Sequence, residues 1–313
     1  MGIFIAVALL IVGLILCVKG SDIFVDSAKW LATATGISCA VIGATVVAFS
    51  TSAPELFITL FASLRGHADL AIGNIVGSEA VNVGIGIAIV AIALPGCHKD
   101  KLFMFRAIIM VVTLFMLLAF ALTGAISWVH GIFFLLVFVV FCYANIRYSK
   151  DSTCPPRQKT SGKEITINII KFIIGIAAVL FGAHLVVDSA SYIAIEWGMS
   201  EALVGVTIVA AGTSLPEILT CIQSVRKKEY GMAIGSIVGS SIFNIALVLG
   251  IVSIASGAMP VPTTMARIEI PIIALMSLVV VIPSLLTKKI HRWQGYVLLA
   301  LYATFLTFAI INS

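Results

Sequence analysis

Two glutamates recur in the same five-residue pattern, each inside a long apolar stretch. The sequence reads TSAPE at 51–55 and TSLPE at 213–217. On a helix, the Thr and Ser that stand four and three residues before the Glu share its face. The Pro cannot donate a hydrogen bond to the carbonyl four residues before it, so that carbonyl stays free. Each pattern therefore gathers a carboxylate, two hydroxyls and a loose carbonyl, all of them oxygen ligands.

This donor set favours a hard cation. Two carboxylates neutralise one divalent cation, and Ca²⁺ takes about 6–8 oxygen ligands in proteins. No Cys or His adjoins either pattern, which argues against Zn²⁺ and Cu⁺. The alternative is a proline kink whose Glu pairs with a basic residue of a neighbouring helix, but no Lys or Arg lies deep within an apolar segment. We therefore predict that Glu55 and Glu217 form a cation site.

A second pattern recurs after each of these. The sequence reads GSEAVN at 77–82 and GSSIFN at 239–244, and in both the Ser and the Asn stand four residues apart on one helix face. The glycines also suit close helix packing, which is the purely structural explanation. Because Ser and Asn recur at matching places, we predict that they add ligands to the cation site; they are Ser78, Asn82, Ser240 and Asn244.

One acidic residue breaks the correspondence between the two patterns. Glu79 has Ser241 as its counterpart, and it stands three residues before Asn82. Three roles remain open for it: a third carboxylate of the site, a proton carrier, or a rim residue that reaches water. Asp26 and Asp188 also recur at matching places, near the polar ends of two apolar segments, and we expect them to solvate or cap helix ends.

The elements that carry these residues must cross a membrane. The chain has 313 residues, of which 61% are hydrophobic and only 11% charged, with a mean hydropathy of +1.17. A bilayer-spanning helix needs about 20 apolar residues. Ten segments approach this length: 3–24, 40–64, 70–94, 103–122, 128–146, 165–187, 201–225, 231–256, 268–286 and 293–312.

The distribution of basic residues orients these ten spans. The net charge of +5 would suggest nucleic acid as a partner of a soluble domain, but here Lys and Arg cluster in short loops, so we expect no such partner. Ten spans place seventeen of the nineteen basic residues on one side. The positive-inside rule then puts the polar linker 147–164 in the cytoplasm and both termini outside the cell membrane.

The chain is an internal duplication. At an offset of 162 residues, segment 43–94 matches 205–256 at 20 of 52 positions without a gap. Each half, 1–146 and 165–313, holds five predicted spans, an odd number, so the second half must be inverted relative to the first. We predict an all-α polytopic membrane protein with ten transmembrane helices in two inverted five-helix repeats. Such repeats are typical of secondary transporters, whose site lies at the repeat interface near the bilayer midplane.

These residues resemble the two α-repeats of the Ca²⁺:cation antiporter superfamily, and within it most of all the prokaryotic sodium/calcium exchangers. The resemblance covers essentially the whole chain. It implies that Glu55 and Glu217 bind Ca²⁺ together with the carbonyls of Thr51 and Thr213. It implies that Na⁺ uses the same glutamates, with Asn82 and Asn244 beside the central position and further oxygens from Ser52, Ser214, Ser78, Ser240 and the carbonyls of Ala48 and Ala210.

The function implied is antiport of Na⁺ for Ca²⁺ by alternating access, with the long first and sixth spans sliding as a gate and the two cations competing for one site. The alternative is an antiporter driven by H⁺, or one that carries Mn²⁺ or Mg²⁺. A channel would need an oligomeric ring, and an intramembrane enzyme would need a catalytic set that the scattered His residues do not form. We expect no cofactor, inorganic cations and the lipid bilayer as partners, and function as a monomer.

Three departures from the family pattern qualify this expectation. Ser50 replaces the Gly that usually precedes the first TS pair. Asn244 stands where K⁺-dependent exchangers rely on an acid, so K⁺ coupling is not expected. Glu79 has no counterpart in the family, and it leaves room for proton coupling.

Overall fold

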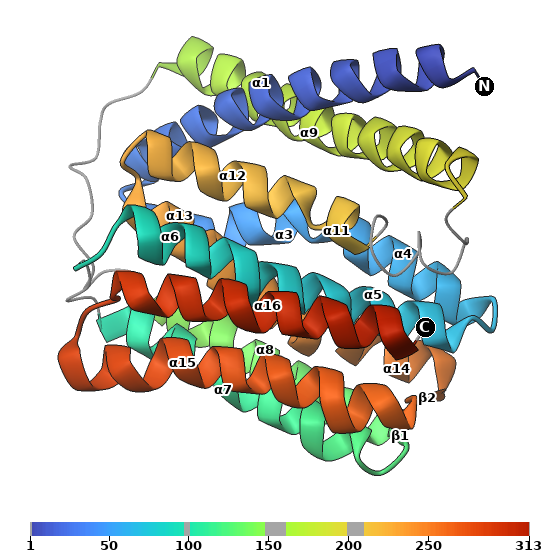
Figure 1. The fold of residues 1–313 in the computed structure, drawn as a ribbon. Helices are drawn as coiled ribbons and strands as arrows, with labels where there is room; N and C mark the ends of the chain where they lie inside the picture. Colours follow the sequence, from blue (N-terminus) through green and yellow to red (C-terminus); the bar gives the residue numbers. More distant parts are fainter. Residues whose placement is uncertain (1, 97–100, 148–160, 199–209, 313) are drawn as a thin grey trace.

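The computed structural model describes residues 2–96, 101–147, 161–198 and 210–312, and most of them lie in helices. The helices lie in layers (Figure 1). Two long helices, α1 and α9, form one edge of the molecule, broken helices form its centre, and four further helices close the opposite side. The core lies around the central broken helices. In two of these spans, Ala68–Ala93 and Tyr230–Ser256, 83% of the most apolar stretch is buried inside the protein.

The edge layer consists of α1 (Ile3–Thr35) and α9 (Gly162–Glu196), which pack along each other. A Cβ atom added at Gly182 would lie 2.7 Å from the carbonyl oxygen of Gly13, so the two backbones touch where both residues lack a side chain. Both helices exceed the predicted spans. α9 begins with a capping box between Ser161 and Glu164, and α1 ends at Gly36, whose φ of 74° is left-handed.

The extra length of these helices corrects the role predicted for Asp26 and Asp188. Neither caps a helix end, because α1 and α9 continue beyond them. Asp26 instead pairs with Lys227 at 2.7 Å, and Asp22 pairs with the same Lys227 Nζ at 2.7 Å. A further pair joins Lys29 to Glu229 at 2.6 Å. α1 is thereby tied to the turn between α12 and α13.

The central layer is made of helices that are interrupted. In the first half, a bend of 41° separates the helices on either side of Ser52. Short π-helical stretches interrupt the next helix of each half, a feature that is frequent at functional sites. The segments are α2 (Cys39–Ile42), η1 (Gly43–Val47), α3 (Ala48–Thr51), α4 (Ala53–Leu64), α5 (Ala68–Val81), η2 (Asn82–Gly86) and α6 (Ile87–Ala93). Their counterparts in the second half are α11 (Ala210–Thr213), α12 (Leu215–Arg226), α13 (Tyr230–Ile242), η5 (Phe243–Leu249) and α14 (Gly250–Ser256).

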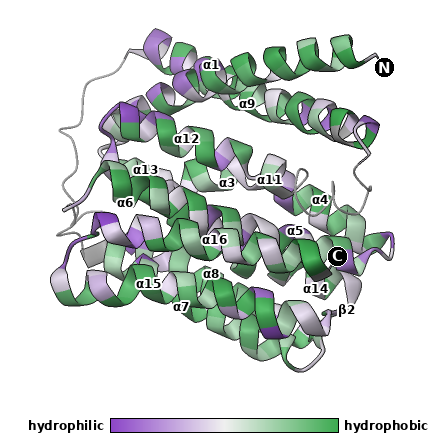
Figure 2. Ribbon diagram, viewed as in Figure 1, coloured by the Kyte–Doolittle hydropathy of each residue, from purple (hydrophilic) through white to green (hydrophobic). Residues whose placement is uncertain are grey.

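The opposite layer holds four long helices and a small sheet. The elements are α7 (Lys101–Ala121), α8 (Trp128–Arg147), η6 (Met265–Glu269), α15 (Ile270–Thr287), α16 (Arg292–Asn312), β1 (Ala125–Ser127) and β2 (Ala258–Pro260). β1 and β2 pair antiparallel. The outward faces of the long helices are largely hydrophobic (Figure 2). Exposed apolar side chains include Phe133 and Val139 of α8 and Ile282 of α15, as a lipid-facing surface requires.

The structure confirms an integral, multi-pass membrane protein. Among the described residues, eight helices are long and apolar enough to cross a membrane, or nine when the bent pair Cys39–Thr51 and Ala53–Leu64 counts as one span. Each matches a predicted segment. The remaining prediction, 201–225, lies partly outside the described residues. The short β1–β2 sheet departs from the predicted all-helical fold, because two loops far apart in the sequence meet there and pair.

Candidate cation site

The two TS-x-PE patterns fold in the same way. At Ser52 the backbone leaves the helix with φ −83° and ψ 3°, and at Ser214 with φ −85° and ψ 2°. A proline then opens the next helix, α4 or α12, where it needs no hydrogen-bond partner. Glu55 and Glu217 therefore lie in the first turn of their helices, where N–H groups that have no acceptor within the helix favour a negative charge.

The two breaks face each other in the core. Ser52 Oγ donates a hydrogen bond to Glu217 Oε1 at 3.1 Å, and Glu55 lies beside Ser214. The two carboxylates are close enough for their charges to interact. Both are fully buried. The structure thus brings together the two glutamates that the sequence singles out, each next to the serine of the opposite half.

Two further contacts connect the halves through hydroxyl groups. Thr51 Oγ1 lies 3.5 Å from Ser240 Oγ, and Ser78 Oγ lies 3.3 Å from Thr213 Oγ1. Shifting either contact by the repeat offset of 162 residues gives the other one. The GS-x-x-x-N helices α5 and α13 therefore approach the breaks as the sequence predicts.

The structure adds a polar group that the sequence analysis does not single out. Asn74 of α5 accepts a hydrogen bond from Thr213 Oγ1 at 3.3 Å and donates one to Thr59 Oγ1 at 3.0 Å. Asn74 stands four residues before Ser78, on the same helix face, which is the signal that would have found it. Its counterpart Ser236 instead donates to a carbonyl of its own helix, Ala233 O.

The backbone carbonyls near the two breaks differ in the hydrogen bonds that they accept. Ala48 O accepts from Ser52 N at 2.9 Å and from Thr51 Oγ1 at 3.3 Å, so its own helix occupies it in this structure. Ala210 is the first residue of α11, at the edge of the described chain. Pro54 has no N–H to donate to the carbonyl of Ser50.

Many side-chain atoms of the site lack a hydrogen-bond partner in the part of the chain that the structure describes. Both Glu55 oxygens, Glu217 Oε2, Ser214 Oγ and the amide groups of Asn82 and Asn244 are buried without a hydrogen bond among the described residues. Buried polar groups normally have partners. A hard cation coordinated by oxygen would satisfy these carboxylates, hydroxyls and amide oxygens together. The residues present therefore fit a cation such as Ca²⁺ or Na⁺ as the cargo of this site.

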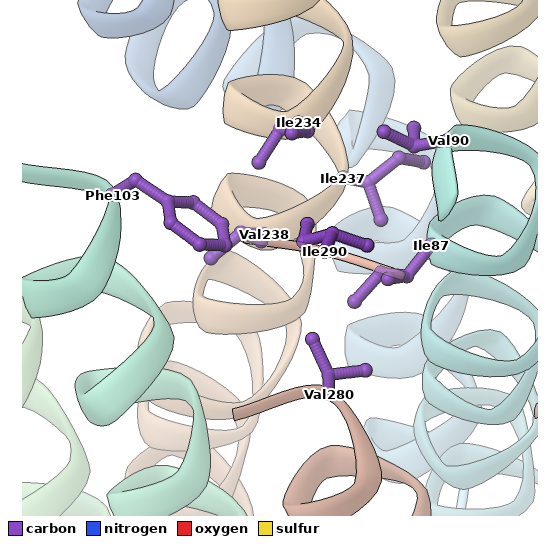
Figure 3. Close-up of a pocket in the computed structure, with 8 residues that line it drawn as sticks. All are labelled: Ile87, Val90, Phe103, Ile234, Ile237, Val238, Val280 and Ile290. Atoms are coloured by element: carbon purple, nitrogen blue, oxygen red, sulfur yellow. The ribbon is translucent and has the colours of Figure 1, made fainter. Parts of the chain in front are cut away.

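The donors form a site with two carboxylates and neutral oxygens. Within the described chain, no group of three or more His, Cys, Asp or Glu side chains is placed to hold a metal ion. Glu79 is fully buried beside Ser241, so it is not a rim residue in contact with water in this structure. A small pocket near Ile87, Phe103, Ile237 and Val280 has only apolar lining residues and offers no ligand to a cation (Figure 3).

Comparison with known proteins shows the family of the chain. The family model described as sodium/calcium exchanger protein matches residues 5–147 and 167–311. The chain belongs to this family. The resemblance predicted from the sequence is thereby confirmed, and the chain is a membrane transporter of the cation/Ca²⁺ antiporter class and not an enzyme.

Individual relatives are similar over almost their full length. The membrane protein MJ0091 of Methanocaldococcus jannaschii is 33% identical over 93% of this chain and 94% of its own. Sodium/calcium exchanger MaX1 of Methanosarcina acetivorans is 28% identical over 95% and 96%. A solved structure of the sodium-calcium exchanger NCX_Mj, soaked with Na⁺ and Ca²⁺, superposes on this protein with a TM-score of 0.84 at 30% sequence identity. The match covers 96% of the present chain and 97% of the NCX_Mj chain.

Proposed function

We propose that this exchanger moves Ca²⁺ across the cell membrane in exchange for Na⁺, through one site built on Glu55 and Glu217. The observation that carries the proposal is the crossed arrangement of the two breaks, in which each buried carboxylate lies beside the serine of the other half. Na⁺ and Ca²⁺ are both hard cations that take oxygen ligands. One set of oxygens therefore serves either ion, and the two ions compete.

The ligands divide into carboxylates and neutral oxygens. Glu55 and Glu217 supply the charge in both states. The carbonyls of Thr51 and Thr213 complete the Ca²⁺ site. For Na⁺ the neutral oxygens, in the order of the chain, are the carbonyl of Ala48, the hydroxyls of Ser52 and Ser78, the amide oxygen of Asn82, the carbonyl of Ala210, the hydroxyls of Ser214 and Ser240, and the amide oxygen of Asn244.

The charge of the site favours export of Ca²⁺. Two ionised glutamates are neutralised by one Ca²⁺, whereas three Na⁺, the number that the family suggests, leave one positive charge. Exchange of three Na⁺ for one Ca²⁺ then moves one net charge across the membrane. Such a charge is worth about 2.3 kcal/mol per 100 mV, so a potential that is negative inside drives Na⁺ entry and Ca²⁺ exit.

Alternating access requires two states, and inverted repeats supply them. The Thr51–Ser240 and Ser78–Thr213 contacts are exchanged by the 162-residue offset, which supports two halves related by a pseudo-two-fold axis. The two long helices α1 and α9 also meet at equivalent positions. Cys17 Sγ of α1 contacts the carbonyl of Val179 of α9, which stands 162 residues later. We propose ten spans in all, halves 1–146 and 165–313, with α1 and α9 sliding as the gate.

The basic loops support one orientation. Both termini lie outside the cell and the linker 147–164 lies in the cytoplasm. A variant that retains only Cys154 tests this, because a membrane-impermeant maleimide then labels the linker only after the cells are opened. Labelling of intact cells at the same rate contradicts the orientation. We propose that the monomer is the transporting unit, since both glutamates of the site come from one chain.

Uptake of ⁴⁵Ca²⁺ into proteoliposomes tests the exchange. Vesicles loaded with Na⁺ are diluted into Na⁺-free medium at clamped pH. We expect uptake that depends on the outward Na⁺ gradient in the wild type, and none in Glu217→Gln. Asp69→Asn is the control, because it removes an exposed carboxylate at the start of α5. Uptake by Glu217→Gln at the wild-type rate contradicts the proposal.

A second driving ion has one observation in its favour. Glu79 is a third buried carboxylate without a hydrogen-bond partner among the described residues, and a proton carrier needs such a group. The same vesicles with a pH gradient and no Na⁺ distinguish the two: uptake under these conditions identifies an H⁺-driven antiporter. Replacing ⁴⁵Ca²⁺ with Mn²⁺ or Mg²⁺ identifies the divalent substrate.

A further inference from the structure

Glu79 of α5 has no charged partner and no hydrogen-bonded one in the described chain. Its side chain is fully buried, and neither carboxylate oxygen accepts a hydrogen bond from a described residue. An isolated carboxylate in an apolar interior is strongly unfavourable, so such a group takes up a cation or a proton. The crossed glutamate pair does not account for Glu79, because the three carboxylates do not form one metal-binding group.

The polar residues around Glu79 are also buried and have side-chain atoms without a hydrogen bond among the described residues. Ser241 of α13 lies beside it. Asn82 stands three residues after Glu79, and Asn244 three residues after Ser241, so each follows on the same side of its helix. All four side chains are fully buried, and the Ser241 hydroxyl and both polar atoms of each Asn lack a hydrogen bond among the described residues. The segments that carry them are packed together, η2 on α13 and η5 on α5.

This cluster adjoins the crossed glutamates without coinciding with their site. Ser78 faces Thr213 of the site. With about 100° between successive residues of a helix, Glu79 points about 100° away from Ser78, and Asn82 points between the two. The same relation holds for Ser240, Ser241 and Asn244 on α13. The two asparagines therefore lie between the glutamate site and a second position at Glu79, and they can contact both.

The geometry points to a second cation position, which takes one alkali cation, Na⁺, on Glu79, Ser241, Asn82 and Asn244. A cation at this position contacts the Glu79 carboxylate, the Ser241 hydroxyl and an amide oxygen of each asparagine, and it neutralises the buried charge of Glu79. The inference rests on the proposed function for its charge count. Three carboxylates carry three negative charges, and one Ca²⁺ with one Na⁺ neutralises them.

Direct binding of ²²Na⁺ to purified, immobilised protein tests this position without transport. The background is the double variant Glu55→Gln, Glu217→Gln, which removes both charges of the glutamate site. We expect this protein to retain one saturable Na⁺ per chain at constant pH, and the further change Glu79→Gln to abolish it. Asp69→Asn in the same background is the matched control, since it removes an exposed carboxylate of the same helix and must leave binding unchanged.

A second variant guards against loss of folding. Ser241→Ala keeps the carboxylate and removes one hydroxyl, and the loss of one polar contact is expected to weaken ²²Na⁺ binding about tenfold in protein that elutes as wild type. Equal binding with and without Glu79, or no Na⁺ binding in the double variant, overturns the inference. Sodium-driven Ca²⁺ uptake by the wild type would stand in either case, so the two failures are distinct.

Discussion

The hydroxyl of Ser52 donates a hydrogen bond to Glu217 Oε1 across the interface of the two halves. Ser52→Ala leaves Glu217 Oε1 without this donor, in addition to Oε2, which has none among the described residues. A hydrogen bond to a charged group contributes about 1.5–3 kcal/mol. Each 1.4 kcal/mol is a tenfold change in affinity. If Ser52 is also a Na⁺ ligand, its loss should raise the Na⁺ concentration needed for half-maximal competition by about 10- to 100-fold.

The assay is inhibition of ⁴⁵Ca²⁺ binding by Na⁺, measured on purified protein at constant pH. Ser50→Ala is the matched control. It removes a hydroxyl only two residues away, which donates to Val46 O of its own helix at 2.8 Å. We expect the control to change the Na⁺ requirement by less than about twofold, as do most substitutions away from a functional contact. Equal effects of the two substitutions would refute the role of Ser52.

Two further perturbations test the surroundings of the site. Asn74→Ala removes the hydrogen bonds to Thr213 and Thr59, each worth about 1 kcal/mol, so we expect Ca²⁺ affinity to fall about tenfold; its counterpart Ser236→Ala, which loses only a bond within its own helix, should bind Ca²⁺ as wild type does. Lys227→Met breaks the ion pairs between α1 and the turn after α12, and partly exposed pairs contribute at most about 1 kcal/mol each. Hydrogen exchange of residues 18–29 should become a few-fold faster in this variant and not in Arg226→Met; unchanged exchange contradicts the idea that these pairs hold α1 in place.

Much of this architecture follows from the sequence because the membrane imposes simple rules. Apolar length predicts the spans, and the repeated TS-x-PE pattern predicts that Glu55 and Glu217 lie together where the two halves meet. The ends of α1 and α9 are missed for a physical reason. Hydropathy ends where the apolar stretch ends, but a helix continues until a capping residue stops it, as Gly36 does for α1.

Other features depend on contacts that no local pattern encodes. Asn74 is not repeated in the second half, so the comparison of repeats passes over it. Arg106, near the start of a span, is fully buried and donates from Nε to Asn145 Oδ1 at 2.8 Å, although the sequence suggests no deeply placed basic residue. The β1–β2 pairing joins loops more than a hundred residues apart. The π-helical starts at Asn82 and Phe243 likewise reflect packing between helices.

The central claim is that Na⁺ and Ca²⁺ compete for one site that needs both Glu55 and Glu217. Equilibrium binding of ⁴⁵Ca²⁺ over a series of Na⁺ concentrations tests it most directly, with the wild type, Glu55→Gln and Glu217→Gln compared in protein of the same elution volume. The account predicts that Na⁺ raises the apparent Kd for Ca²⁺ without lowering the number of Ca²⁺ bound, and that either substitution abolishes Ca²⁺ binding. Ca²⁺ binding that ignores Na⁺, or that survives the loss of either carboxylate, would contradict it.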